Sequence, residues 1–154
     1  ADAYIFFSPD GNEDVGDLRK FKPLLQAGAD LVIASRMMRG AVNEEDAQVM
    51  KPRKWANNAL NLLVNVWFRK TGPFVTDSIN GYRAITRPAA QKLMLDATDY
   101  TIEYQMTIRA LKRGMTIVEF PTHEGSRVAG ETGAPSLPTG IRFLKRLWRE
   151  IQSR

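Results

Sequence analysis

The stretch Tyr4-Ile5-Phe6-Phe7-Ser8-Pro9-Asp10-Gly11-Asn12 decides the fold of this 154-residue chain. It begins with four consecutive large apolar residues, a pattern typical of a β-strand that is buried on both faces. The Pro-Asp-Gly-Asn sequence that follows favours a tight turn, so the strand is expected to end abruptly. This turn places the carboxylate of Asp10 and the amide of Asn12 at the carboxyl end of a strand, the edge where open α/β sheets bind ligands. We therefore expect the turn to bind a divalent metal ion and, through it, a nucleotide diphosphate.

The composition is that of a single globular domain covering residues 1–154. Hydrophobic residues make up 44% and charged residues 25% of the chain, both ordinary values. The chain has no cysteine and one histidine, His123, which excludes thiolate and multi-histidine metal sites. A metal would therefore have oxygen ligands, which favour Mg²⁺ or Mn²⁺. The lack of cysteine also fits a reducing compartment, and we expect a cytoplasmic protein.

The chain is basic, with 22 Lys and Arg residues against 17 acidic residues and a net charge of +5. Such a balance suits phosphates, anionic lipid surfaces or nucleic acid. Nucleic acid is disfavoured because the aromatic residues lie on apolar faces of the predicted elements, not within an exposed basic patch. Much of the excess positive charge falls in one late segment, at Arg142, Lys145, Arg146, Arg149 and Arg154.

Strand and helix patterns alternate along the chain and predict an α/β fold with a mostly parallel sheet flanked by helices. Helical spacing of apolar residues predicts helices over residues 13–26, 55–69, 88–95, 102–112 and 140–152, and apolar runs predict strands over residues 4–7, 30–36, 82–85 and 115–121. The first strand–helix–strand unit is expected to be parallel, which would bring Arg36 to the same sheet edge as Asp10. An arginine beside a metal-binding carboxylate suits a diphosphate. The alternative is a surface arginine in a surface loop.

The first strand begins almost at residue 1, although a strand that is apolar on both faces belongs in the centre of a sheet. Either later segments flank it on both sides, or the chain is the later part of a larger domain. We favour the second interpretation.

Two further polar features have alternative interpretations. Asn57, Asn61 and Asn65 are spaced four apart on the predicted helix over residues 55–69, so they either line a cleft or form a solvated helix face. Asp77 precedes a turn at Asn80, where it either orients an arginine or a neighbouring loop, or caps the turn itself.

Four segments, in the order in which they occur, resemble motifs of family 2 glycosyltransferases, specifically of the dolichyl-phosphate mannosyltransferase-like (polyprenyl-phosphate glycosyltransferase) branch. The resemblance covers nearly the whole chain but only the later two-thirds of that family's catalytic domain. The segments are Phe7-Ser8-Pro9-Asp10-Gly11-Asn12, Ala29-Asp30-Leu31-Val32-Ile33-Ala34-Ser35-Arg36, Asp77-Ser78-Ile79-Asn80-Gly81-Tyr82-Arg83, and Glu119-Phe120-Pro121 followed by Arg127-Val128-Ala129-Gly130-Glu131-Thr132.

The resemblance implies the later part of a GT-A-type (Rossmann-like) domain. It also implies metal-dependent transfer of a sugar from a nucleotide diphosphate-sugar to a polyprenyl phosphate. Because that family's nucleotide-binding portion precedes these segments, we expect the chain alone to be inactive. The implied catalytic residues are Asp10, Arg36, Asp77 and Arg127, the implied substrate-binding residues are Arg53, Arg83, Gly130 and Thr132, and the implied metal ligands are Asp10 and Asn12.

The sequence departs from the family pattern at two positions. Ser8 stands where the first Asp of the metal-binding D-x-D motif is usual, so metal binding would depend on Asp10, Asn12 and the diphosphate. Gly133 stands where the family often has Lys, which leaves more of the positive charge near the phosphate to Arg127.

Other functions and locations stay open. The basic, amphipathic helix over residues 140–152 either lies on a membrane surface, making the protein peripheral at the cytoplasmic face, or packs on the sheet with its basic side chains extended to solvent. A glycosyltransferase with a soluble acceptor would need a catalytic base, for which Glu103 is the candidate. A non-catalytic fragment could self-associate into a homo-oligomer through an exposed sheet edge.

Overall fold

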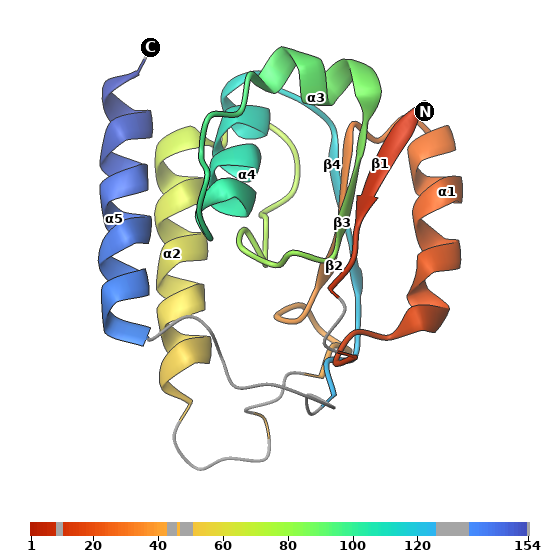
Figure 1. Cartoon of the computed structure of the whole chain (residues 1–154), viewed down its shortest axis with the longest axis horizontal. Coiled ribbons are helices and arrows are strands. Elements are labelled where there is room, and N and C mark those ends of the chain that lie inside the picture. The colour runs from red at the N-terminus through yellow and green to blue at the C-terminus, as the bar shows by residue number, and fades with distance from the viewer. Residues whose placement is uncertain (9–10, 43–45, 47–50, 126–135, 154) are drawn as a thin grey trace.

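The computed structural model describes residues 1–8, 11–42, 46, 51–125 and 136–153 and shows a β-sheet between helical layers (Figure 1). In these residues four strands form one sheet, in the order β1 (Ala3–Phe6), β3 (Arg83–Thr86), β2 (Leu31–Ser35) and β4 (Ile117–Pro121). β3 runs antiparallel to both of its neighbours, while β2 and β4 are parallel. β1, β2 and β4 therefore run in the same direction and share one carboxyl edge. The predicted α/β class is confirmed. The prediction of a mostly parallel sheet is wrong, because two of the three strand pairings in the described residues are antiparallel: β3 lies between β1 and β2 and runs opposite to both.

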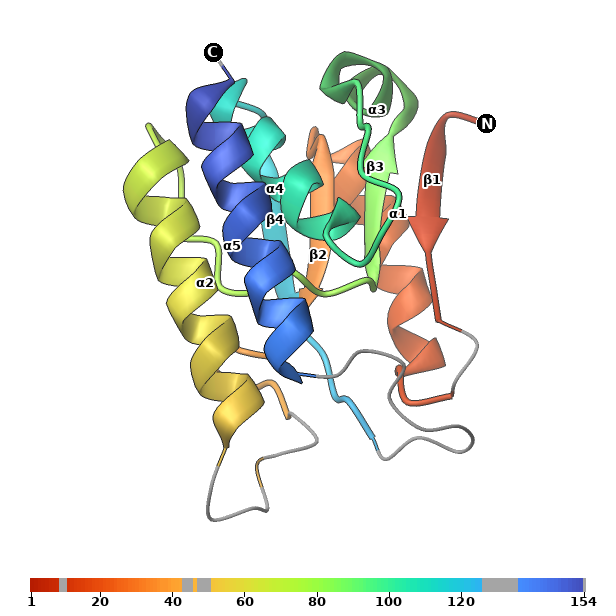
Figure 2. The same ribbon diagram turned by 60° about the vertical axis from the view of Figure 1, so that its left-hand side comes forward.

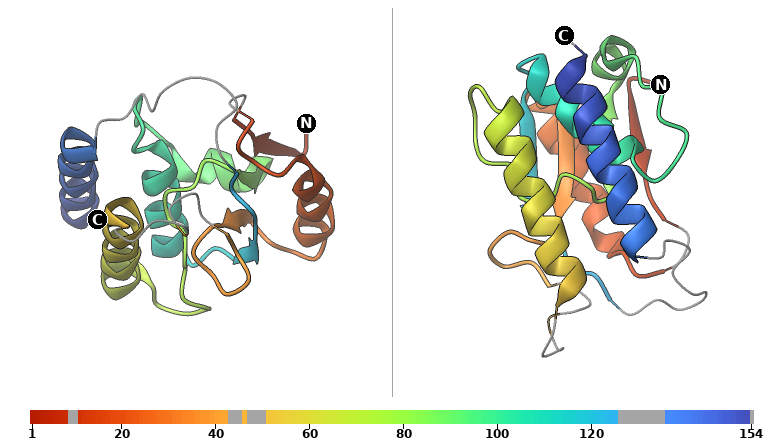
Figure 3. Two further views of the ribbon diagram at one scale, coloured as in Figure 1. Left: turned by 90° about the horizontal axis from the view of Figure 1, so that it is seen from below. Right: turned by 90° about the vertical axis from the view of Figure 1, so that its left-hand side faces the viewer.

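Helices cover both faces of the sheet. The short 3₁₀-helix η1 (Val15–Asp17) leads into α1 (Leu18–Gln26), which covers one face, and α4 (Ile102–Lys112) covers the other. α2 (Pro52–Phe68) and α5 (Ser136–Gln152) lie side by side outside α4, as Figures 2 and 3 show. α3 (Arg87–Leu93) follows β3 at the end of the sheet opposite the shared carboxyl edge.

The helix boundaries follow from local sequence. Gly28 and Gly114 follow α1 and α4 with φ values of 103° and 63°, a left-handed conformation that glycine adopts without a Cβ clash. The Thr86 side chain caps α3 by accepting a hydrogen bond from the Ala89 N–H, and Pro88 occupies the first turn, where its missing N–H has no cost. α5 begins four residues earlier than predicted.

The central strands bury both faces because apolar residues occupy successive positions. Leu31 and Ile33 of β2 face the core formed with α2, α4 and α5, whereas Val32 and Ala34 face the core formed with α1. Phe21 of α1 is fully buried in the second core. Burying one large apolar side chain contributes about 1.5–3 kcal/mol, so both layers hold β2 firmly in place.

β1 lies at the edge of the sheet, which corrects the prediction of a strand buried on both faces. Its sheet neighbour among the described residues is β3. Tyr4, Ile5, Phe6 and Phe7 are 40–46% exposed. Their apolar side chains specified a strand, but the number of its neighbours depends on segments that are distant in sequence.

Among the helices that the structure describes, none is both long enough and apolar enough to cross a membrane.

Candidate functional site

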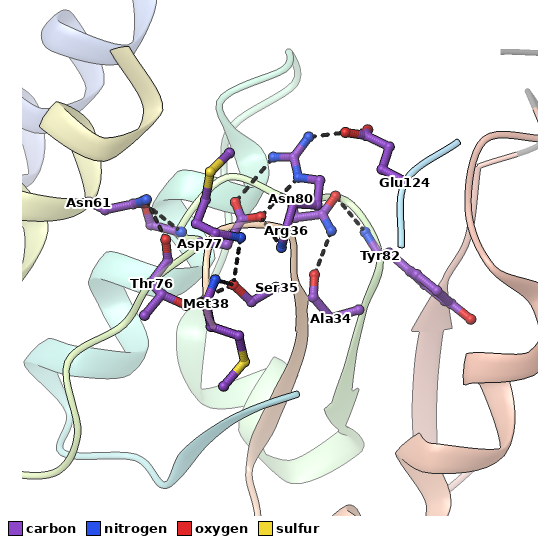
Figure 4. Close-up of polar contacts among 12 residues, drawn as sticks. Ala34, Ser35, Arg36, Met38, Asn61, Thr76, Asp77, Asn80, Tyr82 and Glu124 are labelled. Carbon is purple, nitrogen blue, oxygen red and sulfur yellow. Dashed lines mark hydrogen bonds and ion pairs between the residues drawn. The ribbon is translucent and has the colours of Figure 1, made fainter. Parts of the chain in front are cut away.

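The candidate site lies at the shared carboxyl edge and centres on Arg36, the first residue after β2 (Figure 4). Arg36 Nε donates to Asp77 Oδ2 at 2.9 Å and Nη2 donates to Oδ1 at 3.1 Å, so the carboxylate is bound in a bidentate manner. The backbone N–H of Arg36 also donates to Oδ2, at 3.0 Å. Asp77 is fully buried, whereas the Arg36 side chain keeps 15% of its surface. Asp77 therefore has no exposed surface of its own, and Arg36 is the exposed member of the pair.

The Arg36 guanidinium is charged and can accept a further ligand. Burial opposes its charged form, but attraction to Asp77 and Glu124 outweighs this effect and raises the pKa of Arg36 above its ordinary value. A guanidinium carries five N–H donors, and three of them reach carboxylates: Nε and Nη2 bind Asp77, and Nη1 donates to Glu124 Oε1 at 3.4 Å. Within the described part of the chain the other two have no acceptor. An anion such as a phosphate would satisfy them.

Asn12 contributes a side-chain amide oxygen to the same cluster. Asn12 Nδ2 donates to Glu124 Oε1 at 3.1 Å, and because a carboxylate accepts only, the amide oxygen must point the other way. Asn12 is 6% exposed, and its Oδ1 is a buried atom without a hydrogen-bond partner among the described residues. A buried amide oxygen without a partner is costly, so this atom is suited to a cation or a donor group of a ligand.

A chain of hydrogen bonds joins the loop after β2 to the Asp77 segment. The Thr76 hydroxyl donates to Glu119 Oε2 at 2.9 Å, so Ser35 must donate its own hydroxyl hydrogen to Thr76 across 2.7 Å. Ser35 Oγ in turn accepts from the N–H groups of Met37 and Met38 at 3.1 and 3.2 Å. Burial raises the pKa of the Glu119 carboxyl, and hydrogen bonds from Thr76 oppose that rise.

Arg83, which was predicted to bind substrate, is fully buried. Its Nε donates to the Asn80 carbonyl, Nη1 donates to the Glu103 carbonyl and the Thr107 hydroxyl, and Nη2 donates to the Ser78 carbonyl. Burial lowers the pKa of Arg83 to about 10, and the Glu103 carboxylate is the largest opposing influence. In this structure Arg83 holds the turn over residues 78–80 and does not face an open surface.

The other predicted site residues divide into two groups. Arg53 lies half-buried in the first turn of α2, and Figures 1 and 2 place the start of α2 at the end of the molecule that holds the shared carboxyl edge. Glu103 lies half-buried in the first turn of α4. The remaining residues fall outside the described part of the chain: Asp10, Arg127, Gly130 and Thr132.

Two residues of the cluster, Glu124 and Glu119, were not predicted as site residues from the sequence. Glu124 was not singled out, because it follows β4 in a loop without a distinctive pattern. Glu119 did carry a signal, since it is a charged residue inside the otherwise apolar strand β4, but its partners are 42 and 43 residues away. In the part of the chain that the structure describes, no group of three or more His, Cys, Asp or Glu side chains is arranged to hold a metal.

Known proteins resemble the chain over much of its length, although no protein-family model matches it. It is 30% identical over 146 residues to an uncharacterized protein of Methanocaldococcus jannaschii, covering 93% of this chain and 58% of that protein. It is also 30% identical over 116 residues to the polyprenol monophosphomannose synthase of Mycolicibacterium smegmatis, covering 73% of this chain and 41% of that protein. The chain thus spans about half the length of these relatives. The comparisons relate it to a glycosyltransferase-like protein over most of its own length.

Proposed function

We propose that the chain belongs to the machinery that transfers a sugar from a nucleotide diphosphate-sugar to a polyprenyl phosphate, as a family 2-type glycosyltransferase. The observation that carries the proposal is the Arg36 guanidinium, which Asp77 fixes at the carboxyl edge with two N–H groups directed to no described acceptor. The similarity to a protein named polyprenol monophosphomannose synthase supports a phosphate-bearing lipid as the acceptor.

The proposed reaction needs little help from a general base. An oxygen of the acceptor phosphate forms a bond to the anomeric carbon of the sugar, while the bond from that carbon to the diphosphate oxygen breaks and the nucleoside diphosphate departs. A phosphate monoester has a second pKa of about 6, so the attacking oxygen is already ionised at neutral pH. The chain must chiefly hold two anionic groups close together, and Arg36 contributes a bidentate cation for this purpose. Arg127, Arg53, Gly130 and Thr132 are the further residues proposed to contact the phosphates.

Asn12 and Asp10 are the residues proposed to hold Mg²⁺ or Mn²⁺. The buried, unpartnered Oδ1 of Asn12 fits this role, because hard divalent cations prefer amide and carboxylate oxygens. When bound, such an ion would neutralise the charge that develops on the departing diphosphate. Binding of Mn²⁺ alone tests the assignment: Asn12→Ala should weaken Mn²⁺ binding measured by electron paramagnetic resonance, while Asn58→Ala on the exposed surface of α2 should not.

The outer surface formed by α2 and α5 is suited to a lipid membrane, where a polyprenyl acceptor would reside. α5 buries Phe143 and Leu147 in the core that it shares with α2 and α4, so it packs mainly on these two helices and not on the sheet, where one of the two predicted alternatives placed it. The two helices nevertheless expose large apolar side chains. We call this surface the outer α2–α5 face; its apolar members are Trp55, Leu62, Val66, Trp67, Ile141, Leu144 and Trp148, each 48–70% exposed.

Exposed basic residues adjoin this face on α5, at Arg142, Lys145 and Arg149. A helix pair that combines exposed Trp and Leu with Arg and Lys is typical of proteins that lie in the membrane interface and attract anionic lipids. We therefore propose peripheral attachment to the membrane through the outer α2–α5 face.

Equilibrium binding of farnesyl phosphate, a short polyprenyl phosphate, tests the acceptor assignment. The chain should bind farnesyl phosphate and not farnesol, and Arg36→Lys should weaken binding roughly tenfold because Lys cannot reproduce a bidentate contact. Arg113→Lys, at an exposed arginine after α4, is the matched control and should bind as the unaltered chain does. Equal binding by the Arg36 and Arg113 variants would rule out Arg36 as the phosphate ligand.

A further inference from the structure

The segment over residues 75–78 carries Asp77 but belongs to no helix or strand. Buried backbone N–H groups need partners, and in this segment side chains supply them. Four successive N–H groups donate across 2.7–3.0 Å: Val75 to Asn65 Oδ1, Thr76 to Glu119 Oε2, Asp77 to Glu119 Oε1, and Ser78 to Asn61 Oδ1.

The two asparagines come from one face of α2, since residues four apart in a helix lie one above the other. Asn61 and Asn65 are 2% and 4% exposed, so they line neither a cleft nor a solvated face. Each amide is used at both ends. Asn61 Nδ2 donates to the Thr76 carbonyl while its Oδ1 accepts from the Ser78 N–H, and Asn65 Nδ2 and Oδ1 bind the carbonyl and N–H of Val75.

Glu119 approaches the same segment from β4 and uses both carboxylate oxygens (Oε1 for the Asp77 N–H, and Oε2 for the N–H and hydroxyl of Thr76). The backbone around Asp77 is thus held from two sides, by α2 and by β4. Figure 4 shows the result, in which Asp77 faces Arg36 while Thr76 lies between Asn61 and Ser35.

We propose that Asn61 and Glu119 are positioning residues that set the orientation of the Arg36 guanidinium through Asp77. This inference deepens the proposed function, in which Arg36 binds the acceptor phosphate. Neither residue hydrogen-bonds to Arg36. Each fixes the backbone on one side of Asp77, and a shift of that backbone moves the carboxylate that receives both Nε and Nη2 of Arg36. At metal sites, partners that orient a ligand side chain are commonly worth ~10- to 100-fold in affinity, and we expect an effect at the lower end of that range for Arg36.

Hydrogen exchange of the Arg36 Nε–H, followed by NMR in the ¹⁵N-labelled chain, tests the positioning directly. The resonance is identified by its loss in Arg36→Lys. In Asn61→Leu and Glu119→Gln we expect this N–H to exchange with water about tenfold faster, since its bond to Asp77 becomes misaligned. Asn61→Asp, which keeps an acceptor for the Ser78 N–H, should restore part of the protection.

Two controls separate positioning from general loosening of the fold. Asn58→Leu makes the same change at an exposed position of α2 and should leave Arg36 protected. The Nε–H of Arg109, which donates to Glu150 at 3.1 Å, should stay protected in every variant. Unchanged exchange at Arg36 in both Asn61→Leu and Glu119→Gln would overturn the inference, as would equal acceleration at Arg36 and Arg109.

A double-mutant cycle with farnesyl phosphate supplies the functional arm. As a single substitution, Asn61→Leu should weaken binding about tenfold. Added to Arg36→Lys it should have no further effect, because the two changes remove one shared contribution. Additive losses would show that Asn61 acts independently of Arg36 and would also overturn the inference. If the unaltered chain binds no farnesyl phosphate, the proposed function fails, and the exchange measurement still decides whether Asn61 and Glu119 position Arg36.

Discussion

At the scale of single residues, the buried pair of Arg36 and Asp77 is the most demanding feature of the site. Two charges are removed from water, which is tolerable only because Asp77 accepts three hydrogen bonds from Arg36. Such a pair adds little net stability, yet removal of one partner leaves an uncompensated buried charge. The main effect of the pair is therefore to hold the Arg36 guanidinium in a fixed orientation at the carboxyl edge, and its net contribution to the stability of the fold is small.

Asp77→Asn should lower the free energy of unfolding by about 3 kcal/mol, because it leaves the Arg36 charge without its main partner. Urea denaturation followed by circular dichroism measures this change. Asp96→Asn is the matched control: the Asp96 side chain is 68% exposed, so its ion pair with Arg109 should contribute under about 1 kcal/mol. Equal losses in the two variants would contradict the special role given to Asp77.

Asp96 also predicts a dependence of stability on pH. A hydrogen bond from Gln105, with attraction to Arg109 and Arg146, holds the pKa of the Asp96 carboxyl below its ordinary value. An acid with a lowered folded-state pKa stabilises the fold above its unfolded pKa of about 3.9 and loses that contribution as the pH falls through the folded pKa. Asp96→Asn should therefore reduce the drop in unfolding free energy below pH 4. An identical pH profile for variant and unaltered chain would contradict this assignment.

At the scale of elements, β1 is an edge strand with exposed apolar side chains. Edges of this kind pair with other strands unless they are short, charged or covered. We expect the chain to self-associate through β1 at high concentration. Ile5→Lys should shift the distribution toward monomer in sedimentation velocity, since a lysine on an edge strand opposes pairing. Val15→Lys, at an apolar residue that is 64% exposed on η1, should not, and equal behaviour of the two variants would exclude β1 as the contact.

α2 is the element that links the site to the outer surface. Its buried face carries Asn61 and Asn65, which hold the segment around Asp77, and its opposite face contributes Leu62 and Val66 to the outer α2–α5 face. One helix therefore touches both the proposed lipid surface and the support of Arg36.

At the scale of the whole molecule, the outer α2–α5 face predicts membrane binding. The chain should float with vesicles that contain phosphatidylglycerol, and the bound fraction should fall as salt screens the basic residues of α5. The double variant Val66→Asp with Trp148→Asp should lose most of this binding, because both residues project from the outer face. Val15→Asp is the control on the other side of the molecule, and no vesicle-dependent flotation of the unaltered chain would end the membrane proposal.

The sequence by itself determined the elements, the α/β class and the position of Arg36 at the end of β2, because these depend on apolar spacing and turn residues that are close in sequence. Tertiary structure alone decided three things: the edge position of β1, the burial of Arg83, and the roles of Asn61 and Glu119 in holding residues 75–78. Each of these depends on partners elsewhere in the chain, such as Glu119, which lies 42 positions after Asp77. A buried polar side chain is specified by the groups that satisfy its hydrogen bonds, and only the folded chain brings those groups together.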